Sequence, residues 1–272
     1  IQEAREGRIP HARLFCGPEG IGKLPLAIAY ARYLSCNNPG ESDACGICPN
    51  CVKYNKLAHP DLHFVFPVIK KKNKDTVSDD YIAEWREFIS NTPYFNLNMW
   101  LQEMGAENQQ ALIYVKESDE IYRKLNLKSS QGGYKVMIIW LPEKMNIECS
   151  NKLLKLLEEP PSQTVFLLVS EEPDLLLTTI QSRTQRFNLY GIEDAEIAEK
   201  LMADCPFYTP LAIPAGTYAG QEEDVTTVTV KATLIVSASA TEEDVYNITK
   251  SIFDEAEAIT ALHAKGAELS LE

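Results

Sequence analysis

Apolar runs and amphipathic segments alternate along the first 190 residues of the chain. The apolar runs are short and nearly continuous, as in strands that are buried on both faces of a sheet. They fall at residues 13–16, 63–68, 134–140, 164–170 and 185–189. Segments of helical pattern lie between them, at residues 26–34, 52–59, 113–127 (after a short strand), 151–159 and 175–181. Strands that alternate with helices predict an α/β fold, with a parallel sheet and helices on both faces.

The stretch from about 70 to 110 interrupts this alternation. Its first part, residues 70–80, is charged and rich in turn formers, which predicts a solvated loop; a nucleic-acid-binding patch is the alternative. The remainder is helical in pattern and rich in aromatic residues. We expect an inserted helical hairpin or lid whose aromatic side chains belong to the core, with a base-stacking platform as the alternative.

The pattern changes after residue 190. An acidic helix is predicted over 191–201, then a stretch rich in proline, glycine and threonine to 221, a strand-like segment over 225–237 and a helix from 242 to about 263. Residues 203–272 carry 12 acidic residues, 3 lysines and no arginine, a net charge of −9, whereas the first 202 residues carry 27 acids and 23 bases, a net charge of −4. Such an asymmetry favours a domain boundary near residue 202.

Composition sets broad limits on the class of protein. The 272 residues are 45% apolar, as in soluble globular proteins of one large or two modest domains. No run of about 18 apolar residues predicts a membrane span, and the first ten residues, which begin without methionine, lack the apolar core of a signal peptide. We therefore expect a cytoplasmic protein. Its net charge of −13 argues against a uniformly basic nucleic-acid-binding surface and against an independent zinc-finger DNA binder.

A glycine-rich turn follows the first apolar run. The sequence GPEGIGK has the G-x4-G-K spacing of a phosphate loop, in which Gly17, Gly20 and Gly22 let backbone N–H groups wrap a phosphate and Lys23 neutralises it. The next residue should carry a hydroxyl to hold Mg²⁺, but it is Leu24. Leucine cannot ligate a cation, so metal-assisted ATP hydrolysis is not expected; whether ATP still binds passively on residues 17–23 is left open by the sequence.

A second element of metal handling is also missing. In phosphate-loop ATPases an acidic pair ends the next core strand, where it binds Mg²⁺ and polarises water. Here that strand ends in Trp140 and Leu141, and the nearest acid, Glu143, lies beyond a proline. We interpret Glu143 as a surface turn residue. The two losses together predict an ATPase-shaped protein that does not hydrolyse ATP.

Four cysteines lie close together after the phosphate loop, at Cys36, Cys45, Cys48 and Cys51. Two overlapping C-x2-C steps with a fourth thiol upstream predict a closed tetrahedral site for structural zinc. An iron–sulfur cluster is one alternative, although its fourth cysteine usually lies elsewhere and before a proline. Four unligated thiols are the other.

These motifs occur in the order seen in bacterial clamp-loader subunits. The residues that carry the resemblance are RIPHA at 8–12, the phosphate loop, the four cysteines, NKLLKLLEEPP at 151–161 and Ser182-Arg183. The chain is most similar to the delta-prime members of the DNA polymerase III clamp loader. The resemblance implies an AAA+ domain over 1–190, with a zinc module at 36–51 and a helical insertion at about 70–110, followed by the start of a truncated lid domain at 191–202.

The resemblance also assigns a role to Arg183. In this family the Ser-Arg-Cys motif offers its arginine in trans to ATP bound on a neighbouring subunit, and Thr184 replaces the cysteine here. It implies a non-hydrolysing subunit whose partners are the gamma/tau and delta subunits, the sliding clamp and primer-template DNA. An active gamma/tau-like ATPase is the alternative, and for Arg183 alone, a solvent-facing charge at a helix end.

The tail over 203–272 has a different resemblance. Segments such as FYTP at 207–210, IPAGTY at 213–218 and EDVYNITKSIF at 243–253 are similar to the C-terminal part of TAXI-type solute receptors of TRAP transporters. Those receptors are periplasmic, so the two parts imply different compartments. We expect a partial α/β segment here and hypothesise that the chain is a chimera joined near 201–205. A solute-binding receptor fragment is the functional alternative from another class.

Overall fold

Five parallel strands form the sheet of the first unit of the chain, in the order β2-β3-β4-β1-β5. They are β1 (Ala12–Cys16), β2 (Leu62–Val65), β3 (Lys135–Trp140), β4 (Thr164–Ser170) and β5 (Gln185–Asn188). Each predicted strand of the sheet is present, so the α/β fold with a parallel sheet is confirmed. Because the strands are parallel, all carboxyl ends lie at one edge of the sheet and all amino ends at the other.

The computed structural model describes residues 1–70, 75–107, 109–129, 132–191, 194–218, 220–230 and 236–262. The chain divides into two units, Ile1–Gly191 and Ile192–Glu272. Within the described residues, no helix is long and apolar enough to cross a membrane.

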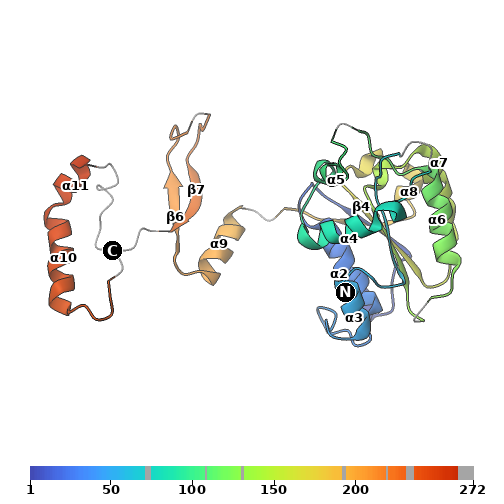
Figure 1. Cartoon of the computed structure of the whole chain (residues 1–272), viewed down its shortest axis with the longest axis horizontal. Coiled ribbons are helices and arrows are strands. Elements are labelled where there is room, and N and C mark those ends of the chain that lie inside the picture. Colours follow the sequence, from blue (N-terminus) through green and yellow to red (C-terminus); the bar gives the residue numbers. More distant parts are fainter. Residues whose placement is uncertain are drawn as a thin grey trace. The chain divides into compact units, whose positions relative to one another are not determined.

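A hydrophobic core lies on each face of the sheet, because successive strand residues point to opposite faces. Val136, Ile138 and Trp140 of β3 belong to one cluster, and Met137 and Ile139 belong to the other. The first cluster is covered by α2 (Lys23–Ser35), α3 (Pro49–Asn55), α4 (Ile82–Asn91) and α5 (Leu97–Glu103). The second is covered by α6 (Val115–Asn126), α7 (Ile147–Glu158) and α8 (Thr178–Gln181) (Figure 1).

Several boundaries differ from the predictions. Helix α7 begins at Ile147 rather than at 151, because the Asn146 side chain caps it by accepting the Cys149 N–H at 2.8 Å. The helix predicted over 175–181 is a 3-10 turn followed by the single-turn helix α8, and the short strand predicted at Ile113 is an isolated bridge to Met145. The remaining short segments are α1 (Gln2–Arg5), η1 (Ser78–Tyr81), η2 (Pro142–Lys144) and η3 (Pro173–Leu175).

Most aromatic residues of the inserted segment form part of the core, as predicted, but Tyr94 is 63% exposed. Trp85 and Trp100 are fully buried. Trp85 stacks on Phe66 with ring centroids 4.1 Å apart, and it meets Trp140 at 5.2 Å. Phe95 contacts Trp140 at 5.0 Å. The insertion is therefore packed onto the end of β3 by aromatic contacts.

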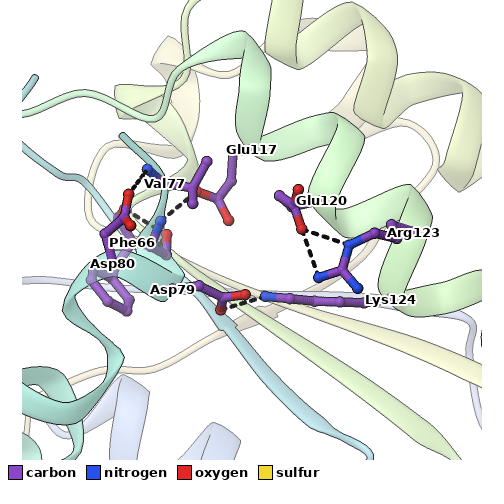
Figure 2. Close-up of polar contacts among 9 residues, drawn as sticks. Phe66, Val77, Asp79, Asp80, Glu117, Glu120, Arg123 and Lys124 are labelled. Carbon is purple, nitrogen blue, oxygen red and sulfur yellow. Dashed lines mark hydrogen bonds and ion pairs between the residues drawn. The ribbon is translucent and has the colours of Figure 1, made fainter. Parts of the chain in front are cut away.

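Polar contacts tie η1 to α6 (Figure 2). A carboxylate oxygen of Glu117 accepts the backbone N–H of Ser78 at 2.7 Å, and Lys124 donates to Asp79 at 2.6 Å. Glu117 is only 2% exposed, and among the described residues its other carboxylate oxygen has no hydrogen-bond partner. Burial raises the pKa of Glu117 to about 7, against the lowering effect of the Ser78 N–H and the Lys124 charge.

The buried Glu117 carboxyl predicts a stability that falls as the pH rises from about 5 to 8. Between its ordinary pKa of 4.5 and about 7 the folded state holds a proton that the unfolded state releases, so ionisation costs the folded state about 3 kcal/mol by pH 8. The variant Glu117→Gln, which cannot ionise, should lack this loss. Tryptophan fluorescence during urea unfolding measures it in the first unit alone, because Trp85, Trp100 and Trp140 all lie there.

The comparison of wild type with Glu117→Gln separates the contribution of Glu117 to the pH dependence of stability from the contributions of other titrating groups. Burial lowers the pKa of His63 to about 4, so His63 makes stability rise with pH below about 6.5 in both proteins. Glu120→Gln is the matched control, since Glu120 lies one turn along α6 and pairs with Arg123 near the surface (Figure 2). A pH dependence of stability that is equal in wild type and Glu117→Gln would contradict the prediction.

The second unit is built differently from the first. Its described elements are α9 (Asp194–Asp204), β6 (Tyr208–Ile213), β7 (Val225–Val230), α10 (Glu242–Asp254) and α11 (Ala256–Leu262). Strand β6 was not predicted, since its stretch is rich in turn formers; β6 and β7 pair as an antiparallel ribbon. The predicted strand continued to 237 and the predicted helix to 263, but residues 231–235 and 263 lie outside the described part. None of the described residues of this unit is buried, and a two-stranded ribbon alone is marginally stable.

Candidate functional site

The phosphate-loop sequence forms the turn between β1 and α2, at the carboxyl edge of the sheet. Gly20 and Gly22 have φ angles of +78° and +83°, which favour glycine. A Cβ atom on Gly17 would lie 2.6 Å from the backbone oxygen of Leu189, because the chain after β5 passes directly beside this turn. The strand–turn–helix context expected of the loop is thus present, and Lys23 is the first residue of α2.

Lys23 is turned inward and bound by the protein's own groups. It is 4% exposed, and its ammonium donates to the carbonyl oxygen of Pro18 and lies 3.8 Å from a carboxylate oxygen of Glu171. Burial lowers the pKa of Lys23, while the charges of Glu171, Glu143 and Glu19 oppose that shift. The positive charge of the loop is therefore already balanced by internal carboxylates.

Two of those carboxylates, Glu143 and Glu171, lie just after the ends of β3 and β4. The sequence analysis interpreted Glu143 as a surface residue and did not identify Glu171. Glu143 does lie in a turn, but it is half-buried, and its carboxylate accepts the backbone N–H groups of Glu171 at 2.9 Å and Glu172 at 3.2 Å. The interpretation of Glu143 as a surface residue is wrong. Glu171 had a usable signal, since it directly follows a buried parallel strand and so lies at the same edge as the loop.

The positions that would handle Mg²⁺ belong to the hydrophobic core. Leu24, Trp140 and Leu141 are 5%, 3% and 1% exposed and share one cluster. Their side chains offer no oxygen ligand, and Mg²⁺ requires oxygen ligands. These residues cannot hold the metal ion that assists phosphoryl transfer.

The inserted segment also narrows the space beside the loop. The Cβ position of Gly22 would lie 3.2 Å from the ring of Tyr94, and Asn96 donates to Glu19 at 2.7 Å. The cavity lined by Lys23, Tyr94, Phe95, Trp140 and Glu171 among others has a volume of about 20 Å³. That is room for about one water molecule. The inserted segment thus leaves little enclosed space beside the phosphate loop.

The four clustered cysteines converge in the loop between α2 and α3. The sulfur atoms of Cys36, Cys45, Cys48 and Cys51 all lie within 4.8 Å of one another, and those of Cys45 and Cys51 are 3.9 Å apart. Zn–S bonds of about 2.3 Å in a tetrahedron put the sulfurs about 3.8 Å apart. The set could hold one metal ion, whereas a multi-iron cluster needs room for several atoms between the sulfurs.

Backbone N–H groups point at three of these sulfur atoms. Cys45 donates to the sulfur of Cys36 at 3.3 Å, Cys48 to that of Cys45 at 3.4 Å and Cys51 to that of Cys48 at 3.4 Å. Backbone hydrogen bonds lower the pKa of Cys45 and Cys48, which favours the thiolate form that binds metals. Burial raises the pKa of Cys51 to about 12, so a metal ion that binds here would have to displace its proton.

Arg183 lies at the other edge of the sheet, just before β5. Its guanidinium binds the Glu158 carboxylate at 2.8 Å and the carbonyl oxygen of Thr179 at 3.0 Å. The side chain is 36% exposed. It borders an open cavity of about 540 Å³ that is also lined by Pro10, His11, Ala12, Leu157, Glu158, Ser182, Thr184 and Gln185.

The structure does not bring Arg183 and the phosphate loop together. β1 and β5 run side by side in parallel, with Arg13 beside Gln185 and Cys16 beside Asn188. Arg183 precedes this pairing and the phosphate loop follows it. Four residues of strand, about 13 Å, separate the two edges, so Arg183 does not reach the phosphate loop of its own chain.

Comparison with known proteins adds to this geometry. Residues 1–193 match the model of the family described as DNA polymerase III, delta subunit. This chain belongs to that family. The delta' subunit of Pseudomonas aeruginosa is 32% identical over 64% of this chain and 41% of its own length, and that of Escherichia coli is 30% identical over 67% and 43%. The tau/gamma subunit of Haemophilus influenzae is 26% identical over 97% of this chain and 34% of its own length.

The similarity to the delta subunit family covers only part of the relatives and only part of this chain. The chain spans less than half the length of these curated relatives. Residues 171–272 match a second family model, described as NMT1-like, which overlaps the first over 171–193. A solved gamma subunit-related protein of Thermotoga maritima superposes with a TM-score of 0.39 at 16% identity, over 72% of this chain and 48% of that one.

Proposed function

We propose that this chain is a non-hydrolysing, delta-prime-like subunit of the DNA polymerase III sliding-clamp loader. The observation that carries the proposal is that Leu24 and Trp140, which stand where an active ATPase would handle the metal ion, lie inside the core. The internal pairing of Lys23 with Glu171 supports it further. A subunit of this kind would contact the other subunits and hold the assembly together without hydrolysing ATP itself.

The proposed chemical contribution is Arg183, offered in trans to ATP on a neighbouring gamma/tau subunit. An arginine finger stabilises charge on the transferring phosphoryl group. Its place at the sheet edge away from the chain's own loop, beside an open cavity, supports action on a neighbour. The delta subunit, the sliding clamp and primer-template DNA are the further proposed partners, in the cytoplasm.

The cysteine cluster is proposed as a structural zinc site. A closed set of four thiolates leaves no open coordination position for catalysis, which favours a structural role. The donor set and its spacing suit zinc, and the N–H groups that face the sulfurs support the thiolate form.

The tail supports a second candidate from another class. The NMT1-like match over 171–272 is consistent with the resemblance to TRAP-type solute receptors and with a chimera of two gene fragments. Against a receptor function stands the lack of any buried residue in the described part of the second unit, because solute receptors enclose their ligands. The alignment of a tau/gamma subunit over 97% of the chain favours clamp-loader membership instead.

ATP turnover by the isolated chain tests the proposal. We expect no turnover above background, because Leu24, Trp140 and Leu141 offer no metal ligand where an active site would need one and the cavity beside the loop is small. Lys23→Ala is the matched control, since it removes the residue on which an active phosphate loop would depend. Turnover by the wild type that disappears in Lys23→Ala would contradict the proposal and favour the active gamma/tau-like ATPase.

A further inference from the structure

We infer that Glu158 is the positioning residue of Arg183: its carboxylate holds the guanidinium in place for the phosphate of a neighbouring subunit. This inference rests on the proposed function of Arg183. The two residues come from different elements, Glu158 from the last turn of α7 and Arg183 from the turn between α8 and β5. Their ion pair, at 2.8 Å, joins those elements beside the open cavity.

The Glu158 carboxylate projects from a helix, α7, whose backbone is held in place by packing and by an N-terminal cap. Leu153 and Leu157 of α7 are 0% and 1% exposed in the core below the sheet edge. Helix α7 is held at its other end by the Asn146 cap. Glu158 therefore has a defined backbone position even though its own side chain is 43% exposed.

The guanidinium has two anchors of different kinds. One terminal nitrogen donates to Glu158, and the other donates to the carbonyl oxygen of Thr179. Because the five N–H donors of arginine lie in a rigid planar fork, these two bonds fix the plane of the group and leave other N–H donors for a ligand. A finger that is already oriented loses less side-chain freedom when the phosphate arrives.

The same pair contributes little to the stability of the fold. Both side chains are more than one-third exposed, and exposed ion pairs are worth little in water. Loss of Glu158 should thus affect the orientation of Arg183 without unfolding the domain. Glu159 is the matched control, because this neighbouring carboxylate is exposed and, within the described residues, has no ion pair or side-chain hydrogen bond.

The test measures the ATPase activity of the gamma/tau subunit from the same organism, in the assembled complex, as stimulated by the full chain. We expect Glu158→Ala to lower the stimulated kcat about tenfold with little change in the KM for ATP. Glu158→Gln should keep most of the stimulation, since its amide oxygen can still accept from the guanidinium, and Glu159→Ala should keep all of it. In a double variant with Arg183→Ala, Glu158→Ala should have no further effect.

A second measurement follows the position of Arg183 directly. In the isolated chain labelled with ¹⁵N-arginine, the side-chain N–H signals of Arg183 should show restricted rotation in wild type and in Glu159→Ala, and free rotation in Glu158→Ala. The inference is overturned if Glu158→Ala stimulates as well as or better than wild type while Arg183→Ala does not stimulate. Stimulation that is equal in wild type and Arg183→Ala overturns instead the finger role on which the inference rests.

Discussion

Replacing Arg183 by alanine is expected to reduce the stimulated ATP hydrolysis of the neighbouring gamma/tau subunit by at least about 100-fold. The reason is electrostatic, because the guanidinium would meet the charge that develops on the transferring phosphoryl group. Binding between the subunits should persist, since Arg183 is one partly exposed side chain at the rim of an open cavity. Turnover at saturating ATP, together with a pull-down of the complex, measures both quantities.

Two further variants sharpen this result. Arg183→Lys keeps the charge but lacks the planar fork, so it should restore little of the stimulation. Arg186→Ala removes an equal charge from the exposed strand β5, where Arg186 bonds Asn188, and should leave stimulation unchanged. Equal losses in Arg186→Ala and Arg183→Ala would point to a general charge effect and would remove the finger role.

If the four cysteines hold zinc as proposed, replacing Cys51 by serine is expected to release the ion and unfold the loop between α2 and α3. Cys51 is fully buried, and its sulfur lies with the other three at the centre of the module. Structural zinc contributes apparent free energies of about 10–16 kcal/mol in small domains, of the order of the whole stability of a typical domain. We expect zinc content to fall from one ion per chain to none and the Tm of the first unit to fall.

Metal analysis and tryptophan fluorescence during heating measure this outcome. Cys205→Ser is the control, because Cys205 lies in the second unit, away from the cluster in sequence, and should leave the zinc content unchanged. Retention of one ion per chain in Cys51→Ser would contradict the prediction. Iron in the purified wild type, with its visible absorbance, would contradict the assignment to zinc.

Local features of the structure were predictable because short segments determine them. The phosphate-loop turn follows from glycine spacing, since Gly20 and Gly22 supply backbone angles that other residues avoid. The cysteine cluster follows from spacing as well, because each C-x2-C step brings its sulfurs together within one turn. Buried strands such as β3 and β4 were recognisable from continuous apolar runs.

Features that depend on distant parts of the chain were missed. The sequence around Glu143 resembles an ordinary surface turn. Its carboxylate is half-buried because the chain directly after β4 passes beside it and donates the N–H groups of Glu171 and Glu172. Strand β6 was missed because its proline- and threonine-rich stretch forms a strand only by pairing with β7. The space beside the phosphate loop is set by Tyr94 and Phe95, whose place depends on how the insertion packs on Trp140.

The sequence by itself determined the five strands of the first unit and the helices between them, the turn that could wrap a phosphate, the set of four thiols and the apolar residues at Leu24, Trp140 and Leu141. These are properties of residue type and short-range spacing. Only the tertiary structure decided that Lys23 pairs with Glu171, that the cavity beside the phosphate loop is small and that Arg183 binds Glu158 at the opposite edge. The physical reason is that a parallel sheet places all strand carboxyl ends at one edge and all amino ends at the other. Lys23 and Glu171, far apart in the chain, therefore become neighbours at the carboxyl edge, whereas Arg183 and the phosphate loop lie at opposite edges.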